Sequence, residues 1–265
     1  RQLLNLLNIL KLYLDLKDNP KKDIYPRVFI FGAKAAPSYT YAKEIIKLIN
    51  SVAELINNDT TINDKLKIVF VENYGVSLAE RIIPAADVSE QISLASKEAS
   101  GTSNMKLMLN GAVTLATLDG ANVEIRDRVG TENIIIFGLT DKEVYQYYRD
   151  GSYHSRSYYD NNPILQRVLN TLIDGTIPDA QTEGRDVFES LVTYGDEFFV
   201  LRDFDSYVQA QETIDQLYRD PLTWQRMALI NIAGAGVFSS DYTVMQYAND
   251  IWDVAYRPSS GEWLN

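Results

Sequence analysis

Residues 98–120, EASGTSNMKLMLNGAVTLATLDG, decide the fold because they carry a turn, a helix and a strand in direct succession. The small polar residues at 100–104 cap helices or accept tight turns, and Gly101 lets a ligand approach the backbone. The apolar helix that follows ends at Asn110, and 113–120 has the pattern of a buried strand. The stretch therefore predicts a helix N-terminus, whose free N–H groups favour an anion such as phosphate, beside a core strand.

Lys106 lies in this helix with Met105 and Leu107 on either side of it in the sequence. The positive end of the helix dipole and low-polarity neighbours both favour the neutral amine, which is the form that condenses with an aldehyde. The alternative is a lysine that lays its aliphatic stem along the protein and keeps its ammonium group in water. The pattern by itself leaves both interpretations open.

Apolar runs alternate with helical patterns along the first half of the chain. Strands are expected at 27–32, 66–74, 113–120 and 133–138, with helices at 38–57 and 77–86. Ser38 is the expected N-cap of the first of these helices, and Pro84 is expected to stop the second. This alternation predicts an α/β fold, with a Rossmann-like parallel sheet that carries helices on both faces.

The rest of the chain is predicted to be mostly helical from about Pro163, with a break at Asp220-Pro221. A single domain over 1–265 with a helical C-terminal layer is the simplest interpretation, and a separate helical subdomain is the alternative. Residues 1–23 have leucines at helical spacing with polar residues between them. That pattern predicts an amphipathic helix and not a targeting sequence.

Composition excludes several classes of protein. The 265 residues include no cysteine, which rules out disulfides and thiolate metal sites and fits a reducing cytoplasm. The single histidine, His154, lies in a polar stretch and is expected to be a solvated loop residue, so no metal site is predicted. The net charge of −11 argues against nucleic acid, and no apolar run is long enough to predict a membrane span.

Parallel sheets bind their ligands outside the carboxyl ends of the strands, so the loops after the strands were expected to form the site. The loops concerned are 32–40, 72–77 and 118–124. The first contains only Gly32 and lacks a nucleotide-binding fingerprint. The others offer Tyr74, Asp119, Asn122 and Glu124. Tyr74 is either a site residue or a half-buried tyrosine, and the last three are either polar ligands or a turn and helix cap.

Residues 72–125, ENYGVSLAERIIPAADVSEQISLASKEASGTSNMKLMLNGAVTLATLDGANVEI, closely resemble the signature region of the α-glucan phosphorylases. The resemblance continues in NIIIFG, WQRMALINIA, FSSDYT and YANDIW, so it extends over nearly the whole chain. It implies the C-terminal domain of a glycosyltransferase-B fold, truncated at its N-terminus. In the family, a basic segment K-R-x-H-E-Y-K precedes RQLLN and holds phosphate groups, and a second Rossmann-like domain completes the active site.

The resemblance also implies a cofactor site for pyridoxal 5′-phosphate. Lys106 matches the lysine that binds the cofactor aldehyde as a Schiff base. Thr102 and Ser103 match positions whose backbone N–H groups bind its phosphate, and Tyr74 matches a tyrosine near that phosphate. Lys106 is accordingly the expected catalytic residue.

A glucosyl site is implied by the same stretch, because Glu98, Ser100 and Gly101 match residues that bind the sugar hydroxyls. Two positions depart from the best-known members. Ser103 stands where those members have glycine, and Gly75 stands where some have arginine. A serine still offers its backbone N–H, but a missing arginine would remove a charge-assisted contact with phosphate.

The implied reaction is the reversible cleavage of terminal α-1,4-glucosidic bonds by inorganic phosphate, which yields α-glucose 1-phosphate. The implied partners are the α-1,4-glucan, phosphate and the missing N-terminal domain, in a cytoplasmic homodimer of a family that includes allosteric enzymes. This chain alone is expected to be inactive, because half of the cleft is absent. The alternatives are a non-catalytic module and a nucleotide-sugar glycosyltransferase domain of similar fold.

Overall fold

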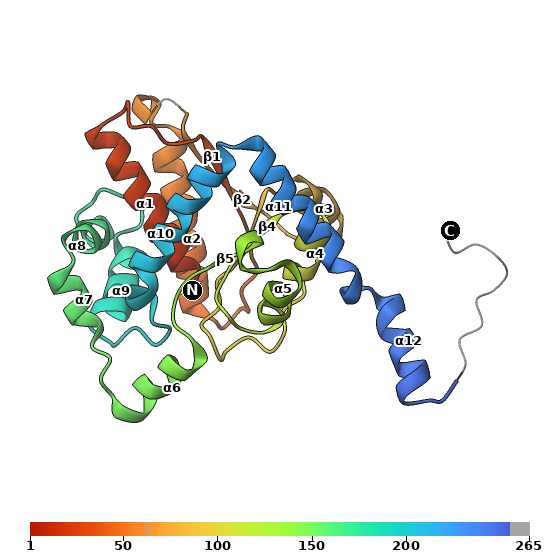
Figure 1. Cartoon of the computed structure of the whole chain (residues 1–265). Helices are drawn as coiled ribbons and strands as arrows, with labels where there is room; N and C mark the ends of the chain where they lie inside the picture. The colour runs from red at the N-terminus through yellow and green to blue at the C-terminus, as the bar shows by residue number, and fades with distance from the viewer. Residues whose placement is uncertain (63, 255–265) are drawn as a thin grey trace.

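The computed structural model describes residues 1–62 and 64–254, and it shows parallel strands flanked by helices (Figure 1). The strands are β1 (Arg27–Gly32), β2 (Leu66–Val71), β3 (Val88–Gln91), β4 (Val113–Ala116) and β5 (Ile135–Ile136). The helices of the first half are α1 (Gln2–Asp18), α2 (Thr40–Asn57), α3 (Val76–Ile82), α4 (Ser103–Leu109) and α5 (Ala121–Val129). Those of the second half are α6 (Asp141–Asp150), α7 (Ser155–Asn161), α8 (Pro163–Asn170), α9 (Gln181–Val192), α10 (Val200–Tyr218), α11 (Pro221–Gly234) and α12 (Ser240–Asp250).

The strands form two ladders, and every pairing in them is parallel. β1 pairs with β2 from Arg27 opposite Leu66 to Gly32 opposite Val71. The second ladder has the order β3–β4–β5. The predicted α/β fold with parallel strands is confirmed. The sequence did not predict β3, because VSEQ is short and only its Ser89 is buried.

Several element ends differ from the predictions for local reasons. Helix α2 begins at Thr40, and its N-cap position is Tyr39, so Ser38 is not the cap. Ser38 lies in the preceding turn, where its carbonyl oxygen accepts a hydrogen bond from the amide of Thr40 at 3.1 Å. Strand β2 ends at Val71 because Asn73 adopts a left-handed conformation with φ of 48°.

Burial follows the position of each strand in its ladder. All four residues of the central strand β4 are buried, as expected for a parallel strand covered on both faces. In β1, by contrast, Phe29 and Phe31 are buried while Val28 and Ile30 are 61% and 49% exposed. The described helices therefore cover β1 on one face.

Helix α1 lies inside the molecule and not on its surface. It contacts α2, α8 and α10, and leucines from several of its faces, among them Leu4, Leu6, Leu7 and Leu10, have no exposed surface. The predicted helix is present, but the prediction that it is amphipathic is wrong. Neighbouring helices also cover the side on which its asparagines lie. Asn5 and Asn8 are buried.

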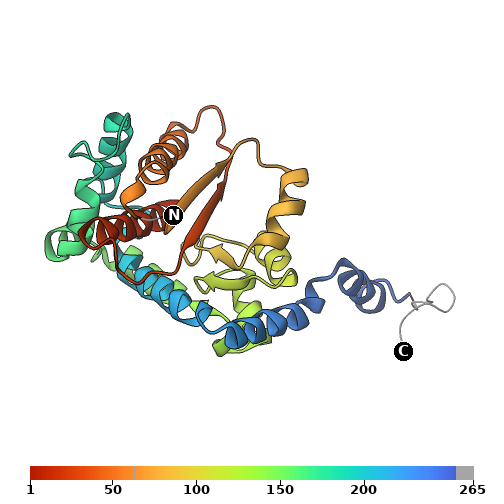
Figure 2. The same cartoon turned by 90° about the horizontal axis from the view of Figure 1, so that it is seen from above.

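The second half of the chain forms the predicted helical layer. Asp220 caps α11 by accepting hydrogen bonds from the amides of Leu222 and Thr223 at 3.1 and 3.3 Å, with Pro221 in the first helical position. Helices α10 and α11 run along one side of the ladders, and α12 extends away from the body (Figure 2). His154 is exposed just before α7, as predicted. No helix in the described ranges is long and apolar enough to cross a membrane.

Candidate functional site

The carboxyl end of β3 lines a cavity of about 690 Å³. Its wall includes Tyr39 from the loop after β1, Lys97 and Glu98 from the loop after β3, and Ser103 and Asn104 from the start of α4. The N-terminal turn of α1 closes another side. Because parallel strands end at one edge of a sheet, segments far apart in the sequence meet here.

The loop before α4 contains a tight turn at Gly101, as the sequence suggested. Gly101 has φ of 81°, which is a conformation that residues with a side chain rarely adopt. Thr102 takes the N-cap position, but its side chain makes no hydrogen bond to the helix. Thr102 and Ser103 are both exposed. The Thr102 side chain therefore leaves the first amides of α4 uncapped, but the amide of Met105 donates to the side-chain oxygen of Asn104 at 2.9 Å.

Two buried asparagines hold this loop against α5. The Asn104 side-chain amide donates to the oxygen of Asn122 at 3.1 Å and to the carbonyl of Ser100 at 3.2 Å. Asn122 in turn donates to the carbonyl of Thr117 at 3.2 Å. Both asparagines are 1% exposed. Asn122 is therefore a structural clamp of this loop, a role that the sequence did not single out, and it also lines the cavity.

Asp119 and Gly120 fix the same loop from the other side. The Asp119 carboxylate accepts hydrogen bonds from the amides of Lys97 and Glu98 at 3.1 and 2.7 Å. Gly120 has φ of 51°, and a Cβ atom there would lie 2.7 Å from the carbonyl oxygen of Ser100. Asp119 thus sets the position of Glu98. Glu124 is exposed in the first turn of α5, away from these contacts.

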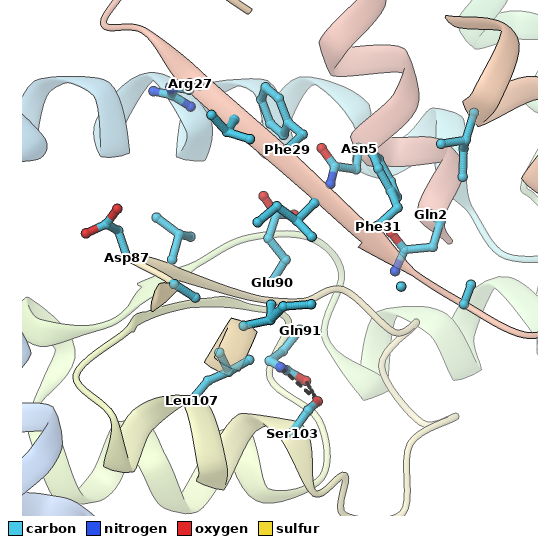
Figure 3. Close-up of a pocket in the computed structure, with 18 of the residues that line it drawn as sticks. Gln2, Asn5, Arg27, Phe29, Phe31, Asp87, Glu90, Gln91, Ser103 and Leu107 are labelled. Atoms are coloured by element: carbon cyan, nitrogen blue, oxygen red, sulfur yellow. Dashed lines mark hydrogen bonds between the residues drawn. The ribbon is translucent and has the colours of Figure 1, made fainter. Parts of the chain in front are cut away.

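Gln91 is a residue of this site that the sequence did not single out. It is the last residue of β3, and its side-chain amide donates to the hydroxyl of Ser103 at 3.2 Å and to that of Ser89 at 3.1 Å (Figure 3). Ser103 thereby links the start of α4 to the end of β3. The family motif gives no signal for this bond, because the usual residue at the position of Ser103 is glycine.

Tyr74 lines a second cavity, which has a volume of about 830 Å³. Gly32 and Ser103 line the same cavity. Tyr74 is half-buried, and a Cβ atom added to Gly32 would lie 2.9 Å from Cδ2 of its ring. Gly32 therefore makes room for the tyrosine. Gly75, the N-cap of α3, has an ordinary extended backbone that does not require glycine.

Lys106 lies in α4, and its side chain is exposed. Its side chain makes no hydrogen bond or ion pair among residues 1–62 and 64–254, and it lines neither cavity. Among the described residues the exposed Lys106 agrees with the alternative in which the ammonium group stays in water, and not with desolvation by Met105 and Leu107. The reason is geometric, because neighbours one position apart on a helix point in different directions and do not cover each other.

No group of three or more His, Asp or Glu side chains in the described ranges could hold a metal ion. What the site offers is backbone amides, hydroxyls, carboxamides and the Glu98 carboxylate, while the Lys106 amine belongs to the same helix but lies outside both cavities. This set suits an anionic group and a polyhydroxy ligand, because amides and amines donate to phosphate and the carboxylate and carboxamides bind hydroxyls.

A parallel α/β domain with an anion-suited turn at the strand ends is a setting common to many sugar- and nucleotide-binding enzymes. Comparison with known sequences gives the particular family: a model described as carbohydrate phosphorylase matches residues 1–254. The chain belongs to the carbohydrate phosphorylase family.

Relatives from bacteria and mammals agree with this assignment. The chain is 54% identical over 254 residues to glycogen phosphorylase of Bacillus subtilis (strain 168), a match that covers 96% of this chain and 32% of the relative. It is 49% identical to the liver form of Bos taurus and 47% identical to the muscle form of Oryctolagus cuniculus, each over 257 residues, 96% of this chain and 30% of the relative. The chain thus spans about a third of the length of the relatives that it matches.

Proposed function

We propose that this chain is the cofactor- and glucosyl-binding part of an α-glucan phosphorylase, which uses inorganic phosphate to cleave terminal α-1,4-glucosidic bonds and releases α-glucose 1-phosphate. The observation that carries the proposal is the stretch 98–112, which matches the family's signature and whose first part, 98–104, is held against the loop and helix that follow β4. A homodimer in the cytoplasm, completed by an N-terminal domain, is part of the same proposal. So is a single domain over 1–265, whose residues 63 and 255–265 lie outside the described ranges.

The residues present fit pyridoxal 5′-phosphate. Thr102, Ser103 and Lys106 are exposed in one short helix and its N-cap, and this supports a single ligand that carries both a phosphate and an aldehyde. In this proposal the Lys106 amine holds the aldehyde, the backbone N–H groups of Thr102 and Ser103 bind the phosphate, and Tyr74 faces it from the β2 side. When bound, the cofactor phosphate supplies a proton donor or an electrostatic partner for the substrate phosphate.

Glu98, Ser100 and Gly101 bind the hydroxyls of the glucosyl unit in this proposal. Glu98 has the support this role needs, because Asp119 holds its amide at 2.7 Å and leaves its carboxylate exposed. Ser100 is held through its carbonyl oxygen by the amide of Ala121 at 2.9 Å. A sugar can therefore meet these groups with little loss of loop freedom.

Lys106 is tested by reducing the cofactor onto the full-length protein with borohydride and mapping the labelled peptide. The expected label lies on Lys106, and Lys106→Ala abolishes it, while the control Lys142→Ala on the exposed face of α6 keeps it. A label on another lysine rejects the assignment. The glycosyltransferase alternative is favoured if the unmodified protein takes up no cofactor and a nucleotide sugar protects the protein.

The 265-residue chain alone is proposed to be inactive, because the family's active site needs a second domain to close the cleft and exclude water. Release of glucose 1-phosphate from a glucan by this chain is the measurement. Turnover near that of the full-length protein would contradict the proposal.

A further inference from the structure

The side chain of Gln211 in α10 links the two ladders. Its oxygen accepts a hydrogen bond from the Arg27 guanidinium of β1 at 2.7 Å, and its nitrogen donates to the Glu90 carboxylate of β3 at 2.7 Å. Figure 3 shows these two partners, Arg27 and Glu90, on separate strands at the cavity of about 830 Å³. Among the described residues, no strand of one ladder pairs with a strand of the other. The carboxamide therefore joins two parts of the molecule that lack a shared strand pairing.

A carboxamide has the chemistry that this position requires. A guanidinium group only donates hydrogen bonds and a carboxylate only accepts them, so the group between them has to offer one acceptor and one donor. The backbone carbonyl of Gln211 accepts a second bond from Arg27 at 2.9 Å. Tyr207 donates its hydroxyl to Glu90 and accepts from the Gln211 nitrogen at 2.9 Å. Gln211 and Tyr207 are 4% and 0% exposed, and a satisfied buried network of this kind fixes the elements that it joins.

The first partner, Arg27, leads along β1 to one wall of the proposed phosphate site. Arg27 is the first residue of this strand and Gly32 is the last. The ring of Tyr74 packs so closely on Gly32 that an added Cβ atom would lie 2.9 Å from its Cδ2. Holding β1 therefore helps to hold Tyr74.

The second partner, Glu90, leads to the opposite wall. The next residue is Gln91, whose side-chain amide donates to the hydroxyl of Ser103 at the start of α4 at 3.2 Å. Ser103 and Tyr74 line the same cavity as Glu90. The bridge at Gln211 thus has one arm toward Tyr74 and one arm toward Ser103.

We infer that Gln211 is a positioning residue for the cofactor phosphate, because it sets the distance between Tyr74 and the first amides of α4. This inference rests on the proposed function, in which the phosphate lies between these two groups. Gln211 acts through Arg27 and Glu90 and does not touch the ligand. Its effect on binding is expected to be large, because the groups of a binding site have to be held within about 0.5 Å of their productive positions.

Titration of the apo full-length protein with pyridoxal 5′-phosphate, and separately with pyridoxal, tests this inference. Gln211→Met removes both arms of the bridge and keeps a long unbranched side chain. The affinity for pyridoxal 5′-phosphate should fall at least fivefold, whereas the affinity for pyridoxal should change less than twofold, because pyridoxal has no phosphate to position. The matched control is Gln209→Met, at an exposed position of the same helix, and it should leave both affinities unchanged.

Two results with Gln211→Met would overturn the inference. One is an unchanged affinity for pyridoxal 5′-phosphate. The other is an equal loss for both ligands, which would indicate a general structural defect and no specific effect on the phosphate. A failure of the proposed function looks different, because the unmodified protein would then bind neither ligand, and the inference would fall with it.

Arg27→Lys is a second variant that keeps the test decisive if Gln211→Met does not fold. Lysine keeps the positive charge beside Asp215, which lies 3.3 Å from the guanidinium, but it lacks the fork that reaches both oxygens of Gln211. A selective loss of affinity for pyridoxal 5′-phosphate is again expected. An unchanged ratio of the two affinities in this variant would also overturn the inference.

Discussion

The side chains of Asn104 and Asn122 are joined by a hydrogen bond of 3.1 Å between two fully enclosed carboxamides. This contact connects the helix that carries Lys106 to the helix that follows β4. Since Asn104 also holds the carbonyl of Ser100, the pair determines where the loop 98–104 lies. The candidate site therefore depends on residues that are not expected to touch a ligand.

Asn122→Leu should loosen this loop. The substitution leaves the Asn104 amide without its buried partner, and an unsatisfied buried donor costs about 1–3 kcal/mol. Faster hydrogen exchange of the peptide 98–112 in the full-length protein is the measurement. The control is Asn161→Ala on the exposed helix α7, which should leave that peptide unchanged. Equal exchange in the two variants would show that the clamp is dispensable.

Gly120→Ala should displace the loop, and it should destabilise the protein by more than the cost of backbone strain alone. Gly120 and Gly151 both have positive φ, at 51° and 63°, but only at Gly120 would a Cβ atom meet the Ser100 carbonyl, at 2.7 Å. Gly151→Ala therefore measures the conformational cost, about 1 kcal/mol. The Gly120 variant should be destabilised further, with a lower melting temperature. Equal losses in the two variants would indicate that the contact with Ser100 relaxes freely.

Ser103→Ala should weaken cofactor binding without abolishing it. The variant keeps the backbone N–H but loses the hydroxyl that Gln91 holds at 3.2 Å, and one such neutral hydrogen bond contributes about 0.5–1.5 kcal/mol. The expected loss of affinity is about 2- to 12-fold in a fluorescence titration of the apo full-length protein with pyridoxal 5′-phosphate. Gln91→Leu should show a similar loss. Unchanged affinity in both would show that this link does not position the amides.

The stability of the 265-residue chain should rise between pH 6 and pH 8. Burial lowers the pKa of the Arg1 α-ammonium group from 8.0 to about 6, so the unfolded chain binds this proton more tightly than the folded chain does. Stability is therefore lost as the pH falls through this window, by at most about 3 kcal/mol. Urea unfolding at several pH values is the measurement. Acetylation of the amino group should remove this part of the dependence, and an identical pH profile after acetylation would contradict the assignment.

The exposure of Lys106 shows where local sequence patterns stop being informative. Met105 and Leu107 are apolar and adjacent, but both are only partly buried, and the buried side of α4 is formed by Asn104 and Met108. Whether the amine is desolvated depends on what packs over the outer side of α4, and the relatives are about three times longer than this chain. The end of β4 gives another case: the strand was expected to run to residue 120 but ends at Ala116, and Asp119 and Gly120 hold the loop that follows it.

The sequence by itself determined the α/β class, the positions of β1, β2 and β4 and the family, because hydrophobic periodicity and a long motif are local properties of the chain. Tertiary structure alone decided that the strands form two ladders with a cavity between them. It also decided that Asn104 clasps Asn122 and that α1 is enclosed on most sides. The physical reason is that these features depend on contacts between segments far apart in the chain.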